Sequence, residues 1–296
     1  MIAETIPLTG TLYIVATPIG NLDDITYRAV RVLGEVQLIA AEDTRHSSRL
    51  LQHYGITTPS IALHEHNERE QAQKLLERME RGVSIALISD AGTPLISDPG
   101  FLLVRLAREK GVPVVPVPGP SAVIAAISVS GLPAGRFCFE GFLPAREGPR
   151  RRTLEALSEE QRTLVFYESP RRIEATLREM GACFGLRREA VIARELTKSF
   201  ETIRRGTLEE LSTWVAADAN QQRGELVILV HGSDRGHPRG GVDSEAGRVA
   251  ELLAAELPAA QAARLAAEIC GEKKNRLYRY LIERQRGTGG SGETKR

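Results

Sequence analysis

Short apolar runs alternate with Gly- and Pro-containing loops and amphipathic segments over residues 11–131. Brief runs rich in Val, Ile and Leu between turn residues are typical of buried strands. Between two such runs, Ala72, Leu75, Leu76 and Met79 recur at the spacing of one helical face. The pattern predicts an α/β domain with a largely parallel sheet. Its strands are expected at Leu12–Ala16, Val36–Ala40, Ser60–Leu63, Val83–Ile88 and Val112–Val115.

A second α/β unit is predicted from Thr163 to about Gly232, with helices over residues 171–180 and 208–217. Its strand candidates lie close together with few crossovers, which favours a mixed sheet. They are Leu164–Tyr167, Ala190–Arg194, Thr202–Gly206 and Leu226–Val230. The Gly-, Pro- and Arg-rich stretch Gly141–Arg152, which follows a strand at Phe137–Glu140, is predicted to link the two units.

The last segment predicts two short helices on either side of Gly271. The first has an apolar face, and the second is basic; the apolar positions are Ala262, Leu265, Ala266, Ile269, Leu277, Tyr280 and Leu281. A helix-turn-helix-like nucleic-acid module and a helical hairpin for dimer packing both fit this pattern. The predicted units are therefore residues 11–135, 136–235 and 244–286, with a linker at Ser233–Asp243 and a disordered tail at 287–296.

Three features restrict the class of protein. The cysteines Cys138, Cys183 and Cys270 are odd in number and far apart, which argues against a disulfide framework and a C-x-x-C metal or redox pair. The uncharged stretch Gly111–Gly135 holds five prolines, which an unbroken membrane-spanning helix cannot absorb. No basic region precedes an apolar run near Met1, unlike in a secretory signal. We expect a cytoplasmic protein.

Positive charge is concentrated in two segments of a chain whose net charge is only +1. Residues 271–296 hold eight Lys and Arg against three Glu, and residues 146–152 hold four Arg against one Glu. Phosphate contacts depend on local rather than net charge, so these segments could meet a polyanion. A solvated loop and a frayed tail would have the same composition, and both interpretations stay open.

Three loops follow predicted strands at the edge where parallel sheets bind ligands. Thr17–Asn21 is a tight turn with Pro and Gly, and Pro118–Ala122 brings Ser121 to the start of a helix. The long loop Ser89–Gly100 is stiffened by two X-Pro steps, and its Asp90 and Asp98 could accept from ribose hydroxyls or an amino group. Purely structural turns and helix caps would also use these residues.

Mixed acidic and basic residues follow three further strands, in Ala41–Arg45, Tyr167–Arg172 and Arg194–Lys198. They could hold a charged substrate or form structural ion pairs. His64 and His66 have no evident third ligand, so we interpret them as substrate-facing or structural and predict no metal site. Outside the predicted tail at 287–296, the chain lacks the phosphate-loop, dinucleotide, H-E-x-x-H and G-x-S-x-G motifs.

Taken together and in order, these loops resemble the tetrapyrrole methylase superfamily, the class III S-adenosylmethionine (SAM) methyltransferases, and within it the branch that methylates ribosomal RNA. The resemblance runs from about Leu12 to Tyr280, and its segments are Thr17–Leu22, Ala41–Arg45, Ser89–Pro94, Pro118–Ala122, Tyr167–Arg171 and Arg194–Lys198. Members that act on small tetrapyrroles usually have Gly-Asp-Pro where this chain has Gly92-Thr93-Pro94. That departure puts a tetrapyrrole substrate in doubt.

The resemblance implies two α/β domains of tetrapyrrole methylase type with a small C-terminal helical extension, and a homodimer. It implies an enzyme that uses SAM to methylate the 2′-oxygen of a cytidine in the decoding region of bacterial 16S rRNA. By motif matching, the cofactor-binding residues would be Pro18, Gly20, Asp90, Ala91, Gly92, Thr93, Pro94, Leu95, Ile96, Ser121, Ala122 and Phe142.

A ribose hydroxyl is a poor nucleophile, so a carboxylate or a neutral amine should remove its proton. The candidates are Asp43, Glu168 and Lys198, of which Asp43 is preferred because it follows the second strand and Arg45 could hold a neighbouring phosphate. The residues expected to contact RNA are Arg45, Arg150, Arg151, Arg152, Arg171, Arg194, Lys273, Lys274, Arg276 and Arg279.

Two rival functions stay open on the sequence. A methylase of a corrin or another small tetrapyrrole would not need the basic segments. A SAM- or nucleotide-binding regulatory protein would bind its ligand without turnover, and substitutions at Asp43, Glu168 and Lys198 would then have no effect.

Overall fold

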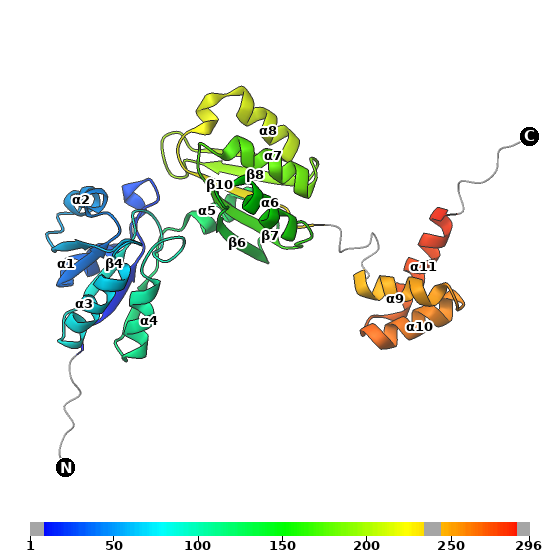
Figure 1. The fold of residues 1–296 in the computed structure, drawn as a ribbon, viewed down its shortest axis with the longest axis horizontal. Coiled ribbons are helices and arrows are strands. Elements are labelled where there is room, and N and C mark those ends of the chain that lie inside the picture. The colour runs from blue at the N-terminus through cyan, green and yellow to red at the C-terminus, as the bar shows by residue number, and fades with distance from the viewer. Residues whose placement is uncertain (1–8, 234–243, 289–296) are drawn as a thin grey trace, which may run out of the picture.

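The computed structural model describes residues 9–233 and 244–288. The predicted linker Ser233–Asp243, apart from Ser233, and residues 289–296 of the predicted tail lie outside the described residues. Figure 1 shows two sheet units and, apart from them, a small helical unit near the C-terminus.

The first sheet contains only parallel pairs, in the order β3-β2-β4-β1-β5. Its strands are β1 (Leu12–Val15), β2 (Leu38–Ala41), β3 (Ser60–Ala62), β4 (Ile85–Ile88) and β5 (Val114–Val117). The predicted parallel sheet is confirmed, although β2, β4 and β5 each begin two residues later than predicted. Val112 donates its N–H to Ala107 at 2.9 Å and so closes the preceding helix rather than starting the strand. Pro116 is tolerated in β5 because this strand lies at the sheet edge.

Helices cover both faces of this sheet, as the alternation of strands and helices requires. They are the 3-10 turn η1 (Leu22–Asp24), α1 (Tyr27–Glu35), α2 (Thr44–His53), α3 (Glu68–Glu80) and α4 (Phe101–Glu109). One core, which includes Leu75 and Leu103, lies under α3 and α4; the other, which includes Leu33 and Leu51, lies under α1 and α2. The predicted face Ala72, Leu75, Leu76 and Met79 is buried.

The second sheet is mixed, as predicted, with the order β6-β7-β10-β8-β9 and one parallel pair, β6 with β7. Its strands are β6 (Phe137–Phe142), β7 (Thr163–Glu168), β8 (Glu189–Arg194), β9 (Thr202–Thr207) and β10 (Leu226–Val230). With it go α6 (Glu147–Ala156), α7 (Ile173–Phe184), α8 (Leu208–Ala217) and the 3-10 turn η2 (Ala219–Gln222). A core that includes Phe166 and Leu177 lies between the sheet and these helices.

Helix α5 (Ala122–Ser130) joins the two sheet units. It follows β5 in the chain, yet Val123, Ala126 and Ile127 pack against Val191 and Val227 of the second sheet. The apolar helix is therefore buried by the unit that comes after it.

The stretch Gly141–Arg152 is not a simple linker, which corrects the prediction. Gly141, at φ +64°, lies in β6 beside a register shift between Phe139 and Gly141, and residues 147–152 begin α6. Arg150 explains the difference, because it is buried and its guanidinium donates to Glu179 of α7 at 2.9 Å. Composition left open a polyanion contact or a solvated loop for this segment, but one of its arginines ties a helix to the core.

The C-terminal unit has three helices, α9 (Ser244–Ala254), α10 (Ala259–Cys270) and α11 (Lys274–Thr288). The predicted break at Gly271 is confirmed by its left-handed conformation, with φ +69°. Ala262, Ala266, Leu277, Tyr280 and Leu281 are buried in a common core, whereas Ile269 is exposed, contrary to the predicted face. Helix α11 continues two residues into the predicted tail. Within the described ranges, no helix is both long and apolar enough to cross a membrane.

Arg150→Ala should lower the free energy of unfolding by about 3 kcal/mol, because it leaves the half-buried Glu179 carboxylate without its partner. Arg151→Ala is the matched control; Arg151 is exposed and pairs with Glu155 four residues on, so its loss should cost less than about 0.5 kcal/mol. Urea denaturation of the two variants measures the difference, and equal stabilities would contradict the structural role of Arg150.

Candidate functional site

A cavity of about 430 Å³ lies where the strand-end loops of the first sheet face the second sheet. This volume is within the range of small-molecule sites. From the first unit it is lined by Ile19, Glu42, Asp90, Ala91, Thr93, Ile96, Ser97, Asp98, Ser121 and Ala122. From the second it is lined by Phe142, Tyr167, Glu168, Ser169, Pro170, Ala193, Leu196, Gly224, Glu225, Leu226 and Val227.

Backbone hydrogen bonds fasten the loops of the first unit to one another. Thr17 and Gly92 exchange N–H···O bonds of 2.9 and 3.0 Å, and the Thr93 hydroxyl donates to Pro120 at 3.0 Å. Leu95 and Ser97 hold positive φ values of 72° and 70°, an unfavourable conformation for side chains with a Cβ. Such strain persists only where the surrounding structure enforces it, and it is concentrated at functional sites.

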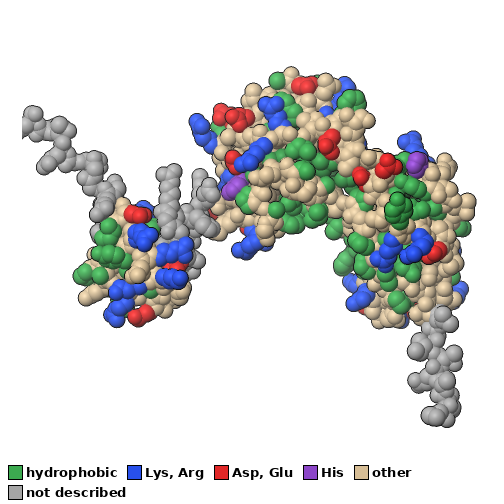
Figure 2. All heavy atoms as spheres, turned by 180° about the vertical axis from the view of Figure 1, so that it is seen from behind, with side chains coloured by type: hydrophobic (Ala, Val, Ile, Leu, Met, Phe, Trp, Pro, Cys, Tyr) green, Lys and Arg blue, Asp and Glu red, His purple; other side chains and the backbone are tan. Residues whose placement is uncertain are grey.

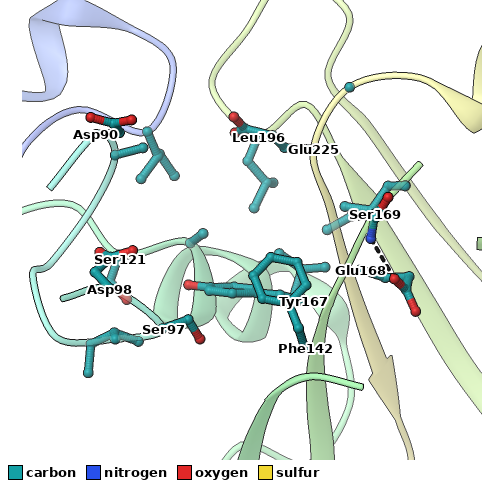
Figure 3. A pocket seen from close by; sticks show the side chains of 18 of the residues that line it. Asp90, Ser97, Asp98, Ser121, Phe142, Tyr167, Glu168, Ser169, Leu196 and Glu225 are labelled. Carbon is teal, nitrogen blue, oxygen red and sulfur yellow. Dashed lines mark hydrogen bonds between the residues drawn. The ribbon is translucent and has the colours of Figure 1, made fainter. Parts of the chain in front are cut away.

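Aromatic rings form the opposite wall. Phe142 and Tyr167 lie with ring centroids 5.5 Å apart, and Phe139 supports Tyr167 edge-on at 4.8 Å. Figure 3 shows the Tyr167 ring reaching from β7 toward the loop that carries Ser97 and Asp98. Burial, with the neighbouring Asp98 carboxylate, raises the pKa of Tyr167 to about 12, so its hydroxyl keeps its proton. These flat apolar surfaces suit a planar ligand ring.

The two units also touch at the loops that follow β1 and β8. The Asn21 N–H donates to the Thr197 hydroxyl at 3.0 Å. A Cβ on Gly20 would lie 2.5 Å from Cγ of Lys198 and 2.9 Å from the Leu196 carbonyl oxygen. Gly20 therefore permits a close approach of the two loops that any side chain would prevent.

Seven of the predicted cofactor residues line the cavity: Asp90, Ala91, Thr93, Ile96, Ser121, Ala122 and Phe142. The other five, Pro18, Gly20, Gly92, Pro94 and Leu95, lie in the same loops but do not line it. Ser121 occupies the N-cap position of α5 without a side-chain cap bond, and Gly100, not Asp98, precedes α4. The interpretation that the side chains of Ser121 and Asp98 cap the helices that follow them is therefore wrong.

Sequence reasoning missed several lining residues. Glu42, Tyr167 and Ser169 lie inside motifs that it had singled out, so their position could have been found there. Leu226 and Val227 of β10 gave no signal, because an apolar strand contributes to the site only through its pairing with β7 and β8.

The three proton-acceptor candidates have other partners. Asp43 caps α2 by accepting from the Arg45 N–H at 2.8 Å, and hydrogen bonds from the Arg45 side chain and backbone lower the pKa of Asp43. Glu168 lines the cavity but accepts from Ser169, Thr176 and Arg172. Burial alone would lower the pKa of Lys198, but its bonds to Glu195 and Glu225 raise it, so Lys198 stays protonated at neutral pH.

The predicted RNA-contacting residues differ in accessibility. Arg45, Arg151, Arg152, Arg171, Lys273, Lys274, Arg276 and Arg279 are exposed. Arg150 is buried against Glu179, and buried Arg194 donates to the carbonyl oxygens of Phe200 and Arg223. Figure 2 shows Lys and Arg side chains gathered on the small helical unit.

His64 and His66 lie beyond β3, with ring centroids 6.0 Å apart. No cluster of three or more His, Cys, Asp or Glu side chains able to hold a metal ion occurs among the residues that the structure describes.

Comparisons with known proteins agree over nearly the whole chain. Residues 11–212 match the family described as Tetrapyrrole (Corrin/Porphyrin) Methylases, and residues 240–285 match the RsmI C-terminal HTH domain. The Ribosomal RNA small subunit methyltransferase I of Pseudomonas aeruginosa is 59% identical over 93% of this chain and 98% of its own. That of Escherichia coli O157:H7 is 54% identical over 93% of this chain and 96% of its own.

Solved structures share the fold at low identity. Uroporphyrin-III-C-methyltransferase from Thermus thermophilus superposes with a TM-score of 0.55 at 18% identity, covering 75% of this chain and 94% of that one. A second structure of that enzyme, complexed with S-adenosyl homocysteine (SAH), gives a TM-score of 0.54 at 21% identity over 74% of this chain and 97% of its own. The chain therefore belongs to the tetrapyrrole methylase family, among the ribosomal RNA small subunit methyltransferase I proteins.

Proposed function

We propose that this protein uses SAM to methylate the 2′-oxygen of a cytidine in the decoding region of bacterial 16S rRNA, acting in the cytoplasm as a homodimer. The observation that carries the proposal is the likeness, at 54–59% identity and over more than nine-tenths of each chain, to proteins named Ribosomal RNA small subunit methyltransferase I. The cavity between the two sheets and the basic C-terminal unit supply the two binding functions that such a reaction needs.

The cavity fits the cofactor in size and in chemistry. It combines aromatic rings, small residues and carboxylates that have no Lys or Arg partner, as a nucleoside with a cationic sulfonium would require. We assign the cofactor to the seven predicted residues that line the cavity, Asp90, Ala91, Thr93, Ile96, Ser121, Ala122 and Phe142. The remaining predicted residues, Pro18, Gly20, Gly92, Pro94 and Leu95, hold these loops in shape.

Bound SAM supplies a methyl group on a sulfonium, which is an activated leaving group. The protein then has to orient the ribose hydroxyl for in-line attack, exclude water and accept one proton. The contact between Asn21 and Thr197 holds the loops of the two units together beside the cavity. Asp43, a carboxylate whose pKa is lowered by hydrogen bonds from Arg45, remains our proposed acceptor for the hydroxyl proton.

The rival functions are less well supported. The solved enzymes that act on tetrapyrroles are about 20% identical to this chain, as in the 18% of uroporphyrin-III-C-methyltransferase, and this chain has Thr93 within the loop where they usually carry Gly-Asp-Pro. A methylase of a small tetrapyrrole would also not need the exposed basic residues Lys274, Arg276 and Arg279 of α11.

Small ribosomal subunits from cells that lack this protein should accept a labelled methyl group from SAM, and mass mapping should place it on a cytidine 2′-oxygen in the decoding region. Subunits from cells that contain the protein are the control, because their site is already occupied. SAM binding without transfer to subunits or to free 16S rRNA would overturn the proposal and favour a small-molecule or regulatory role.

Asp43→Asn should reduce turnover by more than about tenfold while SAM affinity and thermal stability stay unchanged. Asn is as good a helix N-cap as Asp, so this variant removes the charge and keeps the cap. Asp43→Ala, which loses both, shows what the cap contributes. Unchanged turnover in Asp43→Asn would leave capping of α2 as the only role of this residue.

Replacing Lys273, Lys274 and Arg279 by Ala should weaken RNA binding and reduce its salt dependence. For single-stranded RNA, the slope of log affinity against log salt should fall by about 0.7 for each phosphate that the variant no longer neutralises. Arg264→Ala is the matched control, because Arg264 is an exposed arginine of the same unit that pairs with Glu268. An unchanged slope would favour dimer packing as the role of α11.

A further inference from the structure

Three carboxylates in the cavity have no cationic side chain to balance them. Glu42, Asp90 and Asp98 line it, and no Lys or Arg bonds to any of them among the described residues. The other two acidic lining residues are neutralised, Glu168 by Arg172 at 2.7 Å and Glu225 by Lys198 at 3.1 Å. In the described part of the chain, no Lys, Arg or His lines this cavity.

The backbone holds these charges close together. Strands β2 and β4 are parallel neighbours in which Ala41 lies opposite Ile88, so Glu42 and Asp90 follow adjacent strand ends. The Asp90 N–H donates to Oε2 of Glu42 at 3.4 Å, and the Asp43 N–H donates to Oδ1 of Asp90 at 3.1 Å. The Ser89 side chain interacts with the Asp98 carboxylate and lowers its pKa. Neutral donors thus fix the geometry without cancelling the negative charge.

Burial and mutual repulsion make this arrangement unfavourable without a cation. Burial and the charges of Glu42 and Asp90 raise the pKa of Asp98 to about 6, although the Ser89 side chain acts in the opposite direction. Burial and Asp90 also raise the pKa of Glu42. A cation placed among these groups would remove the repulsion and would bind more tightly for that reason.

We propose that Glu42, Asp90 and Asp98 make the cavity select the positively charged cofactor SAM over its neutral-sulfur product SAH. The inference rests on the proposed function only for the identity of the cofactor. SAM and SAH share the adenosine, the ammonium and the carboxylate, and they differ in one methyl group and one positive charge. The selection therefore favours loading of the methyl donor and release of the product.

The selection should depend on pH with a definite sign. Protonation of Asp98 removes one of the negative charges, so preference for SAM is present above pH 6 and is lost as the pH falls through about 6. The charged groups that act on Asp98 are Glu42 and Asp90, and Asp98 in turn acts on Tyr167. Asp90, Asp43 and His46 act on Glu42. Since SAM holds Asp98 ionised, SAM binding near pH 6 should release protons and SAH binding should not.

Isothermal titration calorimetry tests this on the full chain, with the dissociation constants of SAM and SAH measured from pH 5 to pH 8 in buffers of different ionisation enthalpy. Both ligands carry the same ammonium and carboxylate, so the ratio of their constants isolates the sulfonium. In Asp98→Asn, SAM should bind about tenfold more weakly at neutral pH, whereas SAH should change by less than about twofold. The pH dependence of the ratio should disappear in this variant.

Three further variants make the outcome decisive. Glu42→Gln should show the same selective loss, which keeps the test open if Asp98→Asn does not fold. His46→Gln should keep the pH dependence, which separates the carboxylates from the imidazole. Glu80→Gln removes an exposed carboxylate of α3 that does not line the cavity, and it should change nothing.

Equal weakening of SAM and SAH in Asp98→Asn, or a ratio that does not vary with pH in the unmodified protein, would overturn the proposal. Because the test contains no RNA, selective SAM binding without rRNA methylation would reject the proposed substrate and keep this inference. If the protein methylates rRNA but binds SAM and SAH alike, the proposed substrate is kept and this inference is rejected.

Discussion

The parallel pairing of β1 with β4 and β5 is the constraint on which the site depends. Parallel strands end at the same edge of a sheet, so three loops that are far apart in the chain must converge there. The exchange of hydrogen bonds between Thr17 and Gly92 then fixes two of these loops to each other. If one strand slipped by one residue, its side chains would turn to the opposite face of the sheet, and Thr17 and Gly92 would no longer lie opposite each other.

The site also needs the second sheet, because the first unit supplies only one wall of the cavity. Helix α5 belongs to the first unit by sequence and to the second by packing, since its apolar residues contact β8 and β10. The short loops at Gly20 and Leu196 meet beside the cavity. Buried apolar contact thus helps to set the relative position of the two walls, which suits a reaction that requires in-line geometry.

Much of this architecture could be predicted from the sequence, because it follows from local patterns of apolar and polar residues. Contacts between residues far apart in the chain could not be predicted in this way. Strands buried on both faces are continuous apolar runs, so both sheets were predicted, and each of their ten strands overlaps a predicted one. The loops at the strand ends led to Asp90, Asp98 and Ser121, and the resemblance to the family led to seven of the residues that line the cavity. Long-range facts were not accessible: Arg150 resembles any exposed arginine until Glu179 lies beside it. Leu226 and Val227 line the cavity only because of the order of the strands in the second sheet, which the sequence does not reveal.

Glu42 and Asp43 illustrate the same limit at the scale of one residue. Glu42 lines the cavity, whereas its neighbour Asp43 occupies the N-cap position of α2, and nothing in the sequence distinguishes these two roles. Unpaired carboxylates line the cavity, whereas the exposed Arg and Lys side chains lie outside it. Phosphate groups are repelled from a cavity lined by unpaired carboxylates and attracted to the exposed Arg and Lys residues of the chain. Under the proposed function, the cationic cofactor and the polyanionic substrate would be directed to different surfaces, and among the groups of the substrate an uncharged ribose hydroxyl would meet less repulsion at the cavity than a phosphate.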